Sequence, residues 1–177
     1  MTSTTTSVNS THTLSGNTQE IVQAIDALST DEKLALLYFI YEKMGGSITP
    51  AAPVAAEPEL APVLLENFYS LLPEQQLNVM RAIVKGEDTE YSRAYGALTA
   101  NNKLLVWYAW AVDMGDTVVN LPKGYQTTQV VNNALSKIEG LDFEQQISLL
   151  RDVADTMGFS DVKPIASQAE VGKTASL

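Results

Sequence analysis

Apolar residues recur at intervals of three and four along this 177-residue chain, and no stretch alternates as a half-buried strand does. A clear example is the segment that begins near Thr18, whose apolar side chains share one helical face: Ile21, Val22, Ile25 and Leu28. Side chains repeat about every 3.6 residues on a helix and every two residues on a strand. The pattern therefore predicts an all-α fold.

Capping and turn residues set the expected helix boundaries. A second helix opens at Ser29 or Thr30, where a hydroxyl can accept from free backbone N–H groups, and Gly45-Gly46 ends it. The segment 47–62 carries four prolines and is predicted to be an extended connector. Further helices are predicted over 63–72, 73–85, 91–98, 101–116, 130–138 and 143–157, with a loop over 115–128.

The chain is long enough to bury one sizeable core, so we expect a single domain. Residues 1–17 are rich in Ser and Thr and are predicted to be a disordered leader. Residues 18–162 are predicted to form the helical domain. Residues 163–177 lack an amphipathic pattern and are predicted to be a flexible tail.

The residue content excludes several classes of function. A formal net charge of −10 repels phosphate groups, so nucleic-acid binding is not expected. The absence of cysteine excludes disulfides, thiolate metal sites and cysteine nucleophiles. There is no signal-peptide pattern, and no apolar run approaches the ~20 residues of a membrane span. We expect a soluble, cytoplasmic protein and not an integral membrane protein.

Catalytic chemistry is not supported either. His12 is the only histidine and falls in the leader, which argues against a metal site or a Ser-His-Asp arrangement. Neighbouring carboxylates lie mainly at helix starts or in loops, where solvated acidic residues are expected. No Gly-rich phosphate loop is present. We therefore do not expect an enzyme.

Two short stretches, 34–44 and 101–114, hold six of the thirteen aromatic residues. On helices, each places large side chains on one face: Leu34, Tyr38 and Tyr41 in the first, and Trp107, Trp110, Ala111 and Met114 in the second. In one interpretation these stripes are ordinary core. In the other, they form with the methionines at 44, 80, 114 and 157 an adaptable wall around an elongated apolar ligand.

A weak internal repeat runs through the chain. Residues 31–45 align with residues 144–158 at a constant offset of 113, and a looser copy lies at 74–80. The copies are either chance similarities between amphipathic helices or parts of two related bundles whose seam could hold a ligand.

Arg151 takes the place of Tyr38 in this repeat, on an otherwise apolar face. It either pairs with a nearby carboxylate or contacts another protein or domain.

At these residues the sequence resembles the N-terminal, carotenoid-binding domain of the cyanobacterial orange carotenoid protein family. The resemblance runs from about Ile21 to Phe159. Its signatures are Leu34-Ala-Leu through Tyr41, Met44-Gly45, Ile48-Thr49, Ala51-Ala52-Pro53, Asn101, Lys103-Leu104, Trp107-Tyr108, Met114, Pro122, Gly124-Tyr125, Gln145-Gln146-Ile147 through Leu150-Arg151, and Met157-Gly158-Phe159. The chain ends where the family's second, regulatory domain would begin. The resemblance therefore implies a stand-alone helical carotenoid protein that acts without light switching.

The resemblance implies two interleaved four-helix bundles with a ligand tunnel between them. The tunnel is expected to hold a ketocarotenoid, such as canthaxanthin, echinenone or 3'-hydroxyechinenone. Trp107 and Tyr41 would pack on a terminal ring and the nearby polyene. The family positions that line the tunnel correspond to Leu34, Tyr38, Tyr41, Leu77, Met80, Ile83, Leu104, Trp107, Tyr108, Met114, Leu121, Tyr125, Ile147, Arg151 and Met157.

Three positions depart from the two-domain members of that family. Tyr38 stands where they usually have Trp, Pro50 where they have Ile, and Leu77 where they have a small hydroxyl residue. The arginine that matches Arg151 pairs with the second domain in those members. Here that arginine is free, and the resemblance implies that it meets either solvent or a phycobilisome. The partners implied for the protein are a phycobilisome or a regulatory-domain homologue, and the former implies association with thylakoids.

The function that follows from the resemblance is photoprotection by a bound carotenoid, which quenches singlet oxygen, phycobilisome excitation or both. One alternative is a carrier that delivers carotenoid to another protein. Another is an apo helical module that interacts with the antenna and whose aromatic residues are plain core.

Overall fold

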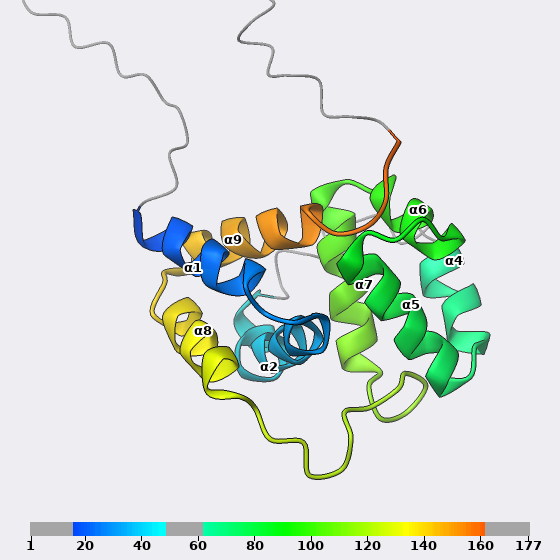
Figure 1. The fold of residues 1–177 in the computed structure, drawn as a ribbon, viewed down its shortest axis with the longest axis horizontal. Helices are drawn as coiled ribbons and strands as arrows, with labels where there is room; N and C mark the ends of the chain where they lie inside the picture. The colour runs from blue at the N-terminus through cyan, green and yellow to red at the C-terminus, as the bar shows by residue number, and fades with distance from the viewer. Residues whose placement is uncertain (1–15, 49–61, 162–177) are drawn as a thin grey trace, which may run out of the picture.

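A computed structural model describes residues 16–48 and 62–161 of the chain (Figure 1). These residues form eight α-helices and one 3₁₀ helix, with no strand among them, which confirms the predicted all-α class. The elements are α1 (Gly16–Asp26), α2 (Thr30–Ile48), α4 (Pro62–Leu65), η3 (Asn67–Ser70), α5 (Pro73–Lys85), α6 (Glu90–Gly96), α7 (Ala100–Val112), α8 (Gln129–Glu139) and α9 (Phe143–Asp155).

The helices form two halves that lie side by side in Figure 1. Helices α1, α2, α8 and α9 make one half, and α4 to α7 make the other. The chain starts in the first half, crosses to the second and returns, so the two bundles are interleaved as expected. Helix α2 packs against α5 and α7, and α9 packs against α7, so these four helices form the seam between the halves.

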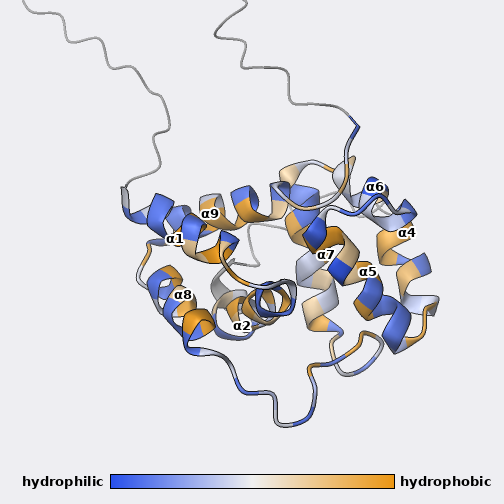
Figure 2. Cartoon of the chain, viewed as in Figure 1, coloured by the Kyte–Doolittle hydropathy of each residue, from blue (hydrophilic) through white to orange (hydrophobic). Residues whose placement is uncertain are grey.

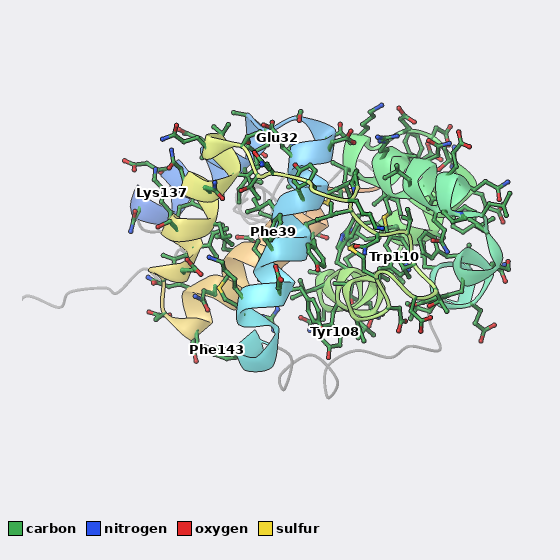
Figure 3. The ribbon with its side chains drawn as sticks, turned by 90° about the horizontal axis from the view of Figure 1, so that it is seen from below. Glu32, Phe39, Tyr108, Trp110, Lys137 and Phe143 are labelled. Atoms are coloured by element: carbon green, nitrogen blue, oxygen red, sulfur yellow. The ribbon has the colours of Figure 1, made fainter. Side chains whose placement is uncertain are left out.

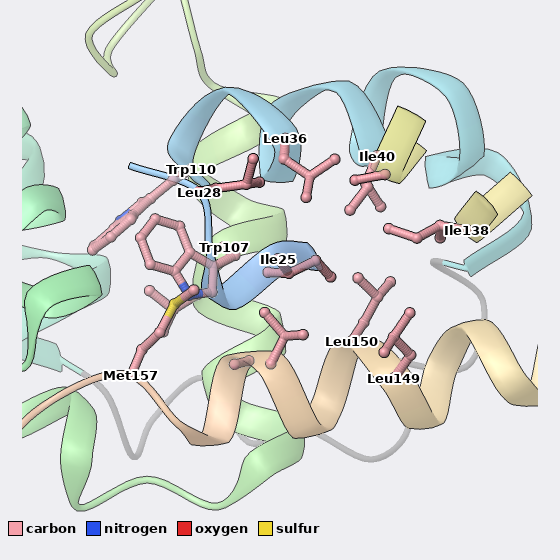
Figure 4. Close-up of a cluster of buried hydrophobic side chains, with 14 of the residues drawn as sticks. Ile25, Leu28, Leu36, Ile40, Trp107, Trp110, Ile138, Leu149, Leu150 and Met157 are labelled. Atoms are coloured by element: carbon pink, nitrogen blue, oxygen red, sulfur yellow. The ribbon is translucent and has the colours of Figure 1, made fainter. Parts of the chain in front are cut away.

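Apolar residues face inward in both halves, and polar residues cover the outside (Figure 2). One continuous cluster of buried side chains joins the halves. The part shown in Figure 4 is built from α1, α2, α7, α8, α9 and the residues just after α1 and α9: Ile25, Leu28, Leu36, Ile40, Trp107, Trp110, Ile138, Leu149, Leu150 and Met157. The seam is therefore part of the core.

Side-chain oxygens begin several of the helices. The hydroxyls of Thr89, Thr99 and Thr128 each accept a hydrogen bond from a backbone N–H three residues ahead. Asp142 and Gln145 form a reciprocal capping box at the start of α9. These local signals explain why the helices from 73 onward begin within one residue of their predicted starts.

Two buried glutamines give the internal repeat a structural basis. The side-chain amide of Gln76 donates to the carbonyl of Phe68 at 3.3 Å, and that of Gln146 donates to the carbonyl of Ile138 at 3.0 Å. Each glutamine is in the first turn of a long helix and reaches back eight residues to the preceding helix. Two of the repeat copies therefore share one way of docking consecutive helices, which favours related bundles over chance similarity.

The expected stop at Gly45-Gly46 is wrong, because α2 continues to Ile48. Gly45 is buried, and a Cβ atom at this position would come within 2.8 Å of the Tyr41 ring. The glycine thus makes room for a ring one turn earlier on the same helix and does not end the helix.

Other predicted boundaries also shift. The single helix expected over 63–72 is divided into α4 and η3, with non-helical backbone at Glu66, and this places Phe68 in the core. Helix α7 ends at Val112 instead of 116, and α1 starts at Gly16 instead of Thr18. Gly16 and Asn17, predicted to belong to the disordered leader, are therefore helical. The rest of the leader with His12, residues 49–61 of the connector with Pro50, and the tail lie outside the described residues.

In the described segments, no helix is both long and apolar enough to cross a membrane.

The end of the described chain is tied to the second half by backbone contacts. The N–H of Gly158 donates to the carbonyl of Ile83 at 2.8 Å, and that of Phe159 donates to the carbonyl of Ser92 at 3.0 Å. At this crossing, a Cβ atom on Gly96 would overlap the backbone carbonyl of Phe159. A glycine is required there because backbone, unlike a flexible side chain, cannot yield.

We predict that Gly96→Ala lowers the free energy of unfolding by about 1–3 kcal/mol, the usual cost of overpacking. For a domain of this size, that corresponds to a fall in Tm of a few degrees per kcal/mol, measured by thermal denaturation. Gly46→Ala is the matched control, because Gly46 is exposed on α2 with open space around it. Its alanine variant should gain about 0.5–1 kcal/mol from helix propensity. Equal effects of the two variants would contradict the assignment.

Candidate functional site

A pocket lies at the seam, between α2 on one side and α5 and α7 on the other. Its cavity volume is about 50 Å³, and the pocket is partly open to solvent. The lining residues are almost all apolar: Leu34, Leu37, Tyr38, Leu77, Met80, Trp107, Trp110, Ala111, Met114, Val119, Asn120 and Leu121. We call this the seam pocket. It brings together seven of the fifteen tunnel residues expected from sequence: Leu34, Tyr38, Leu77, Met80, Trp107, Met114 and Leu121.

The two indoles of α7 form one wall of the seam pocket. Trp107 is 7% exposed and Trp110 1% exposed, and their rings meet edge to face at 5.3 Å. Trp110 also stacks on Phe68 at 4.1 Å. The Trp107 N–H donates to the hydroxyl of Tyr95 at 2.8 Å, and the Trp110 N–H donates to the carbonyl of Leu64 at 3.1 Å. Neither acceptor lines the pocket, so this wall offers ring surface and no indole donor.

One edge of the pocket is formed by the segment that follows α7. Gln76 holds this segment in place: its amide oxygen accepts the N–H of Val119 at 2.8 Å, and its amide nitrogen donates to the carbonyl of Thr117 at 2.9 Å. Farther back, the hydroxyl of Tyr69 donates to Asp113 at 2.8 Å. These bonds fix the backbone that carries Val119, Asn120 and Leu121 into the wall.

The far end of the same connection is held by Glu32 on α2. Its carboxylate accepts the hydroxyl of Thr128 at 2.9 Å, and the backbone N–H and hydroxyl of Ser29, each at 2.9 Å. These hydrogen bonds, the backbone bond from Ser29 above all, lower the pKa of Glu32. Glu32 thus caps α2 and fastens the loop between α7 and α8 with one charged group.

A second aromatic contact lies between α2 and α7. The rings of Tyr41 and Tyr108 meet edge to face at 5.4 Å, and Figure 3 shows Tyr108 beside α2. Both side chains are half-buried. Burial, with the nearby Tyr108 and Asp113, raises the pKa of Tyr41, so its phenol is neutral at physiological pH. The seam between α2 and α7 therefore carries aromatic rings beyond the pocket itself.

The remaining expected tunnel residues are spread through the core and the seam. Ile83, Ile147 and Met157 are buried, and Met157 lies next to Trp107 in Figure 4. Leu104 and Tyr125 are half-buried. None of these five lines the seam pocket as the structure has it.

Arg151 is also half-buried, and within the described chain its Nε atom is buried without a hydrogen-bond partner. None of the ion pairs of the described residues includes it, so the alternative of a carboxylate partner finds no support.

The sequence pattern missed two residues that shape the site. In the sequence, Gln76 is only a polar residue within a repeat copy and does not stand out as a site residue. In the structure it is 2% exposed and holds the segment at the pocket edge. Tyr95 lies on the short helix α6, with no periodic link to the Trp107 that it contacts. A polar residue at a buried repeat position was a usable signal for Gln76. No local signal pointed to Tyr95.

The seam pocket suits a ligand with a large apolar surface. No carboxylate, histidine or lysine is among its lining residues. In the described residues there is no group of three or more His, Asp or Glu side chains that could hold a metal ion. What the arrangement provides is a dry aromatic wall, thioether groups and a partial opening to solvent.

Comparison with protein families gives a match to the family described as "Orange carotenoid protein, N-terminal" over residues 11–160. An orange carotenoid-binding domain-containing protein of Nostoc sp. is 40% identical over 146 residues, which cover 82% of this chain and 84% of that protein. The orange carotenoid-binding protein of Limnospira maxima is 37% identical over 138 residues, 77% of this chain but only 43% of that protein.

Solved structures of relatives have the same fold. The Red Carotenoid Protein of Anabaena (Nostoc) sp., binding canthaxanthin, matches with a TM-score of 0.72 and 38% identity, covering 81% of this chain and 99% of that one. The Orange Carotenoid Protein of the same organism, binding canthaxanthin, matches with a TM-score of 0.74 and 30% identity, covering 85% of this chain and 50% of that one.

The Glu32 contacts predict that the folded protein becomes less stable in acid. Because the folded-state pKa of Glu32 is lowered, its contribution is complete above the ordinary value of 4.5 and is lost as the pH falls through the folded value. Tm should therefore decline below pH 4.5, and Glu32→Gln should make that decline shallower in thermal scans across pH. Glu42→Gln, an exposed change on the same helix, should keep the wild-type slope. Parallel slopes for all three proteins would disprove the role of Glu32.

Proposed function

The chain belongs to the orange carotenoid protein N-terminal family, and from this premise we propose that it is a carotenoid-binding photoprotective protein. The observation that carries the proposal is the seam pocket, an apolar space walled by two indoles whose N–H groups are bonded elsewhere. Relatives with the same fold bind canthaxanthin.

The residues present fit a ketocarotenoid, which is a long, thin and largely apolar molecule with a ring at each end. The seam pocket offers apolar surface for a ring and the adjoining polyene. Tyr41 and Tyr108 lie between the same two helices, so an elongated ligand between α2 and α7 would meet them as well. We propose canthaxanthin, echinenone or 3'-hydroxyechinenone as the ligand, and the fifteen residues named from sequence as its contacts.

In this proposal the chemistry belongs to the pigment, which absorbs visible light and releases the energy of singlet oxygen or an excited bilin as heat. The chain has no catalytic role. Its apolar residues exclude water from the polyene, and its rings hold the ligand in one orientation. Gln76 and Glu32 keep the loop that forms the pocket edge in place.

We further propose that the phycobilisome is the source of the quenched excitation, with Arg151 in the contact. The support is that Arg151 is only half-buried and takes part in none of the ion pairs of the described residues. A carrier function is the second candidate, because the pocket is partly open to solvent and a loop forms one of its edges. Transfer of pigment to an apoprotein acceptor on mixing distinguishes the carrier from a protein that retains its pigment.

The first test is a visible absorption spectrum of the protein purified from a host that makes ketocarotenoids. A carotenoid band that co-elutes with the folded protein supports the proposal, and singlet-oxygen quenching by that fraction supports photoprotection. A folded, helical but colourless protein would refute carotenoid binding and leave the apo interaction module.

Trp107→Ala should lower the ratio of bound pigment to protein by about tenfold or more, because it removes one of the largest apolar contacts of the pocket. The ratio is read from the visible and ultraviolet absorbance of the eluted protein, with circular dichroism to verify the helical fold. Val112→Ala is the matched control on the same helix, since Val112 is 49% exposed. A normal pigment ratio in Trp107→Ala would remove Trp107 from the binding site.

A further inference from the structure

We propose that Tyr95 is a positioning residue for Trp107. Its hydroxyl fixes the orientation of the indole that walls the seam pocket, and so sets how firmly the pigment is held and where it absorbs. This inference rests on the proposed carotenoid function. It concerns a residue that lies behind the pocket wall and does not line the pocket.

The Tyr95 hydroxyl joins three helices. On α6, Tyr95 accepts the N–H of Trp107 from α7 at 2.8 Å and donates to the carbonyl of Ala154 on α9 at 2.7 Å. Tyr95 is 0% exposed, so water cannot replace either partner. Turning the indole away would leave a buried donor unpaired, which is costly. The hydrogen bond therefore selects one orientation of Trp107.

The Tyr95 ring is itself held on one side by a buried lysine. The ammonium of Lys103 lies 5.6 Å from the ring centroid, within the range of a cation–π contact. The same ammonium is 2.8 Å from the carboxylate of Asp155 and donates to the Asp155 carbonyl at 3.3 Å. The Lys103 side chain is only 7% exposed. It is thus fixed at the carboxyl end of α9, where the helix dipole favours a cation.

Backbone also packs closely against the ring. Gly158 has a φ of 85°, and a Cβ atom there would come within 2.6 Å of a ring carbon of Tyr95. The N–H of Gly158 is bonded to the carbonyl of Ile83, so this backbone cannot easily retreat. Burial is the main cause of the raised pKa of Tyr95, and the phenol stays protonated and able to donate. The Tyr95 hydroxyl is therefore held in one position, and so is the indole N–H of Trp107 that it accepts.

The consequence for the pocket follows from the packing of the indoles. Trp107 and Trp110 meet at an interplanar angle of 87°, and both contribute to the wall. A change in the tilt of Trp107 would alter the wall that faces the polyene. Protein groups next to a pigment tune its electronic properties, so the tilt should be visible in the absorption maximum.

The hydrogen bond can be tested without pigment in the full chain. The protein has two tryptophans, and so two indole N–H signals in a proton–nitrogen NMR spectrum. In Tyr95→Phe, the Trp107 signal should shift and exchange faster with deuterium. The Trp110 signal, whose N–H is bonded to Leu64, should shift less and keep its exchange rate. Tyr91→Phe is the matched control, because Tyr91 is one turn earlier on α6 and half-buried.

The pigment-loaded protein gives the decisive measurement. Tyr95→Phe should release carotenoid about tenfold faster, the order expected when one buried hydrogen-bonding group is left unpaired. It should also displace the visible absorption maximum, which a uniform loss of stability would not do. Tyr91→Phe should match the wild type in both. A shifted Trp107 signal with wild-type pigment release and absorption overturns the proposal, as does an unshifted Trp107 signal.

A second variant decides the question if Tyr95→Phe does not fold. Lys103→Met keeps the alkyl stem but removes the cation over the Tyr95 ring, and Asp155, 59% exposed, is left solvated. It should shift the Trp107 signal and the absorption maximum by smaller amounts, and no change in either would overturn the proposal. If the wild type binds no carotenoid, the proposed function fails. The NMR result then still shows whether Tyr95 positions Trp107.

Discussion

Helix α7 must bury two indoles and satisfy both of their N–H groups, and this requirement fixes how α7 packs in the second half and which face it presents to the first. Trp110 takes its acceptor and its stacking partner from the second half, from Leu64 and Phe68. Trp107 takes its acceptor from Tyr95, and its apolar neighbour Met157 follows α9. Because each ring is tied to a different neighbour, α7 cannot rotate without breaking a buried hydrogen bond. The aromatic pair therefore fixes which face α7 turns toward the seam.

Buried amides extend the same principle to the rest of the fold. Gln76 and Gln146 each dock a long helix onto the element that precedes it, and Gln76 also holds the loop at the edge of the pocket. A buried amide is stable only when its donors and acceptor are paired, so it specifies one arrangement more sharply than an apolar side chain would. The two halves are thus related by polar contacts at equivalent positions, around a seam that is mainly apolar.

Much of the fold could be predicted from sequence because its signals are local. Helical periodicity, the hydroxyl caps at Thr99 and Thr128, and the left-handed Gly86 after α5 are readable within a few residues. The helix end predicted at Gly45 is wrong. Glycine often ends a helix because its backbone is free to adopt other conformations, but it can also lie within a helix where a neighbouring ring needs space. Only the packed structure distinguishes these two roles.

The candidate site was predictable in part for the same reason. The stripes on α2 and α7 mark side chains that share a face, and several of them meet in the seam pocket. Tyr95 could not be found this way, because it is twelve residues from Trp107 and on another helix. Contacts that depend on how helices cross, such as that of Tyr95 with Gly158, have no periodic trace in the sequence.

The direction of the two indole N–H groups has a consequence for selectivity. Since both donors point to protein acceptors, the ring wall of the pocket has little with which to distinguish one oxygenated end group from another. Discrimination by hydrogen bonding is strong, whereas discrimination by an apolar wall amounts to only about 1–3 kcal/mol per methylene. A wall of this kind selects molecules by girth and length, and not by the oxygen atoms of their end groups.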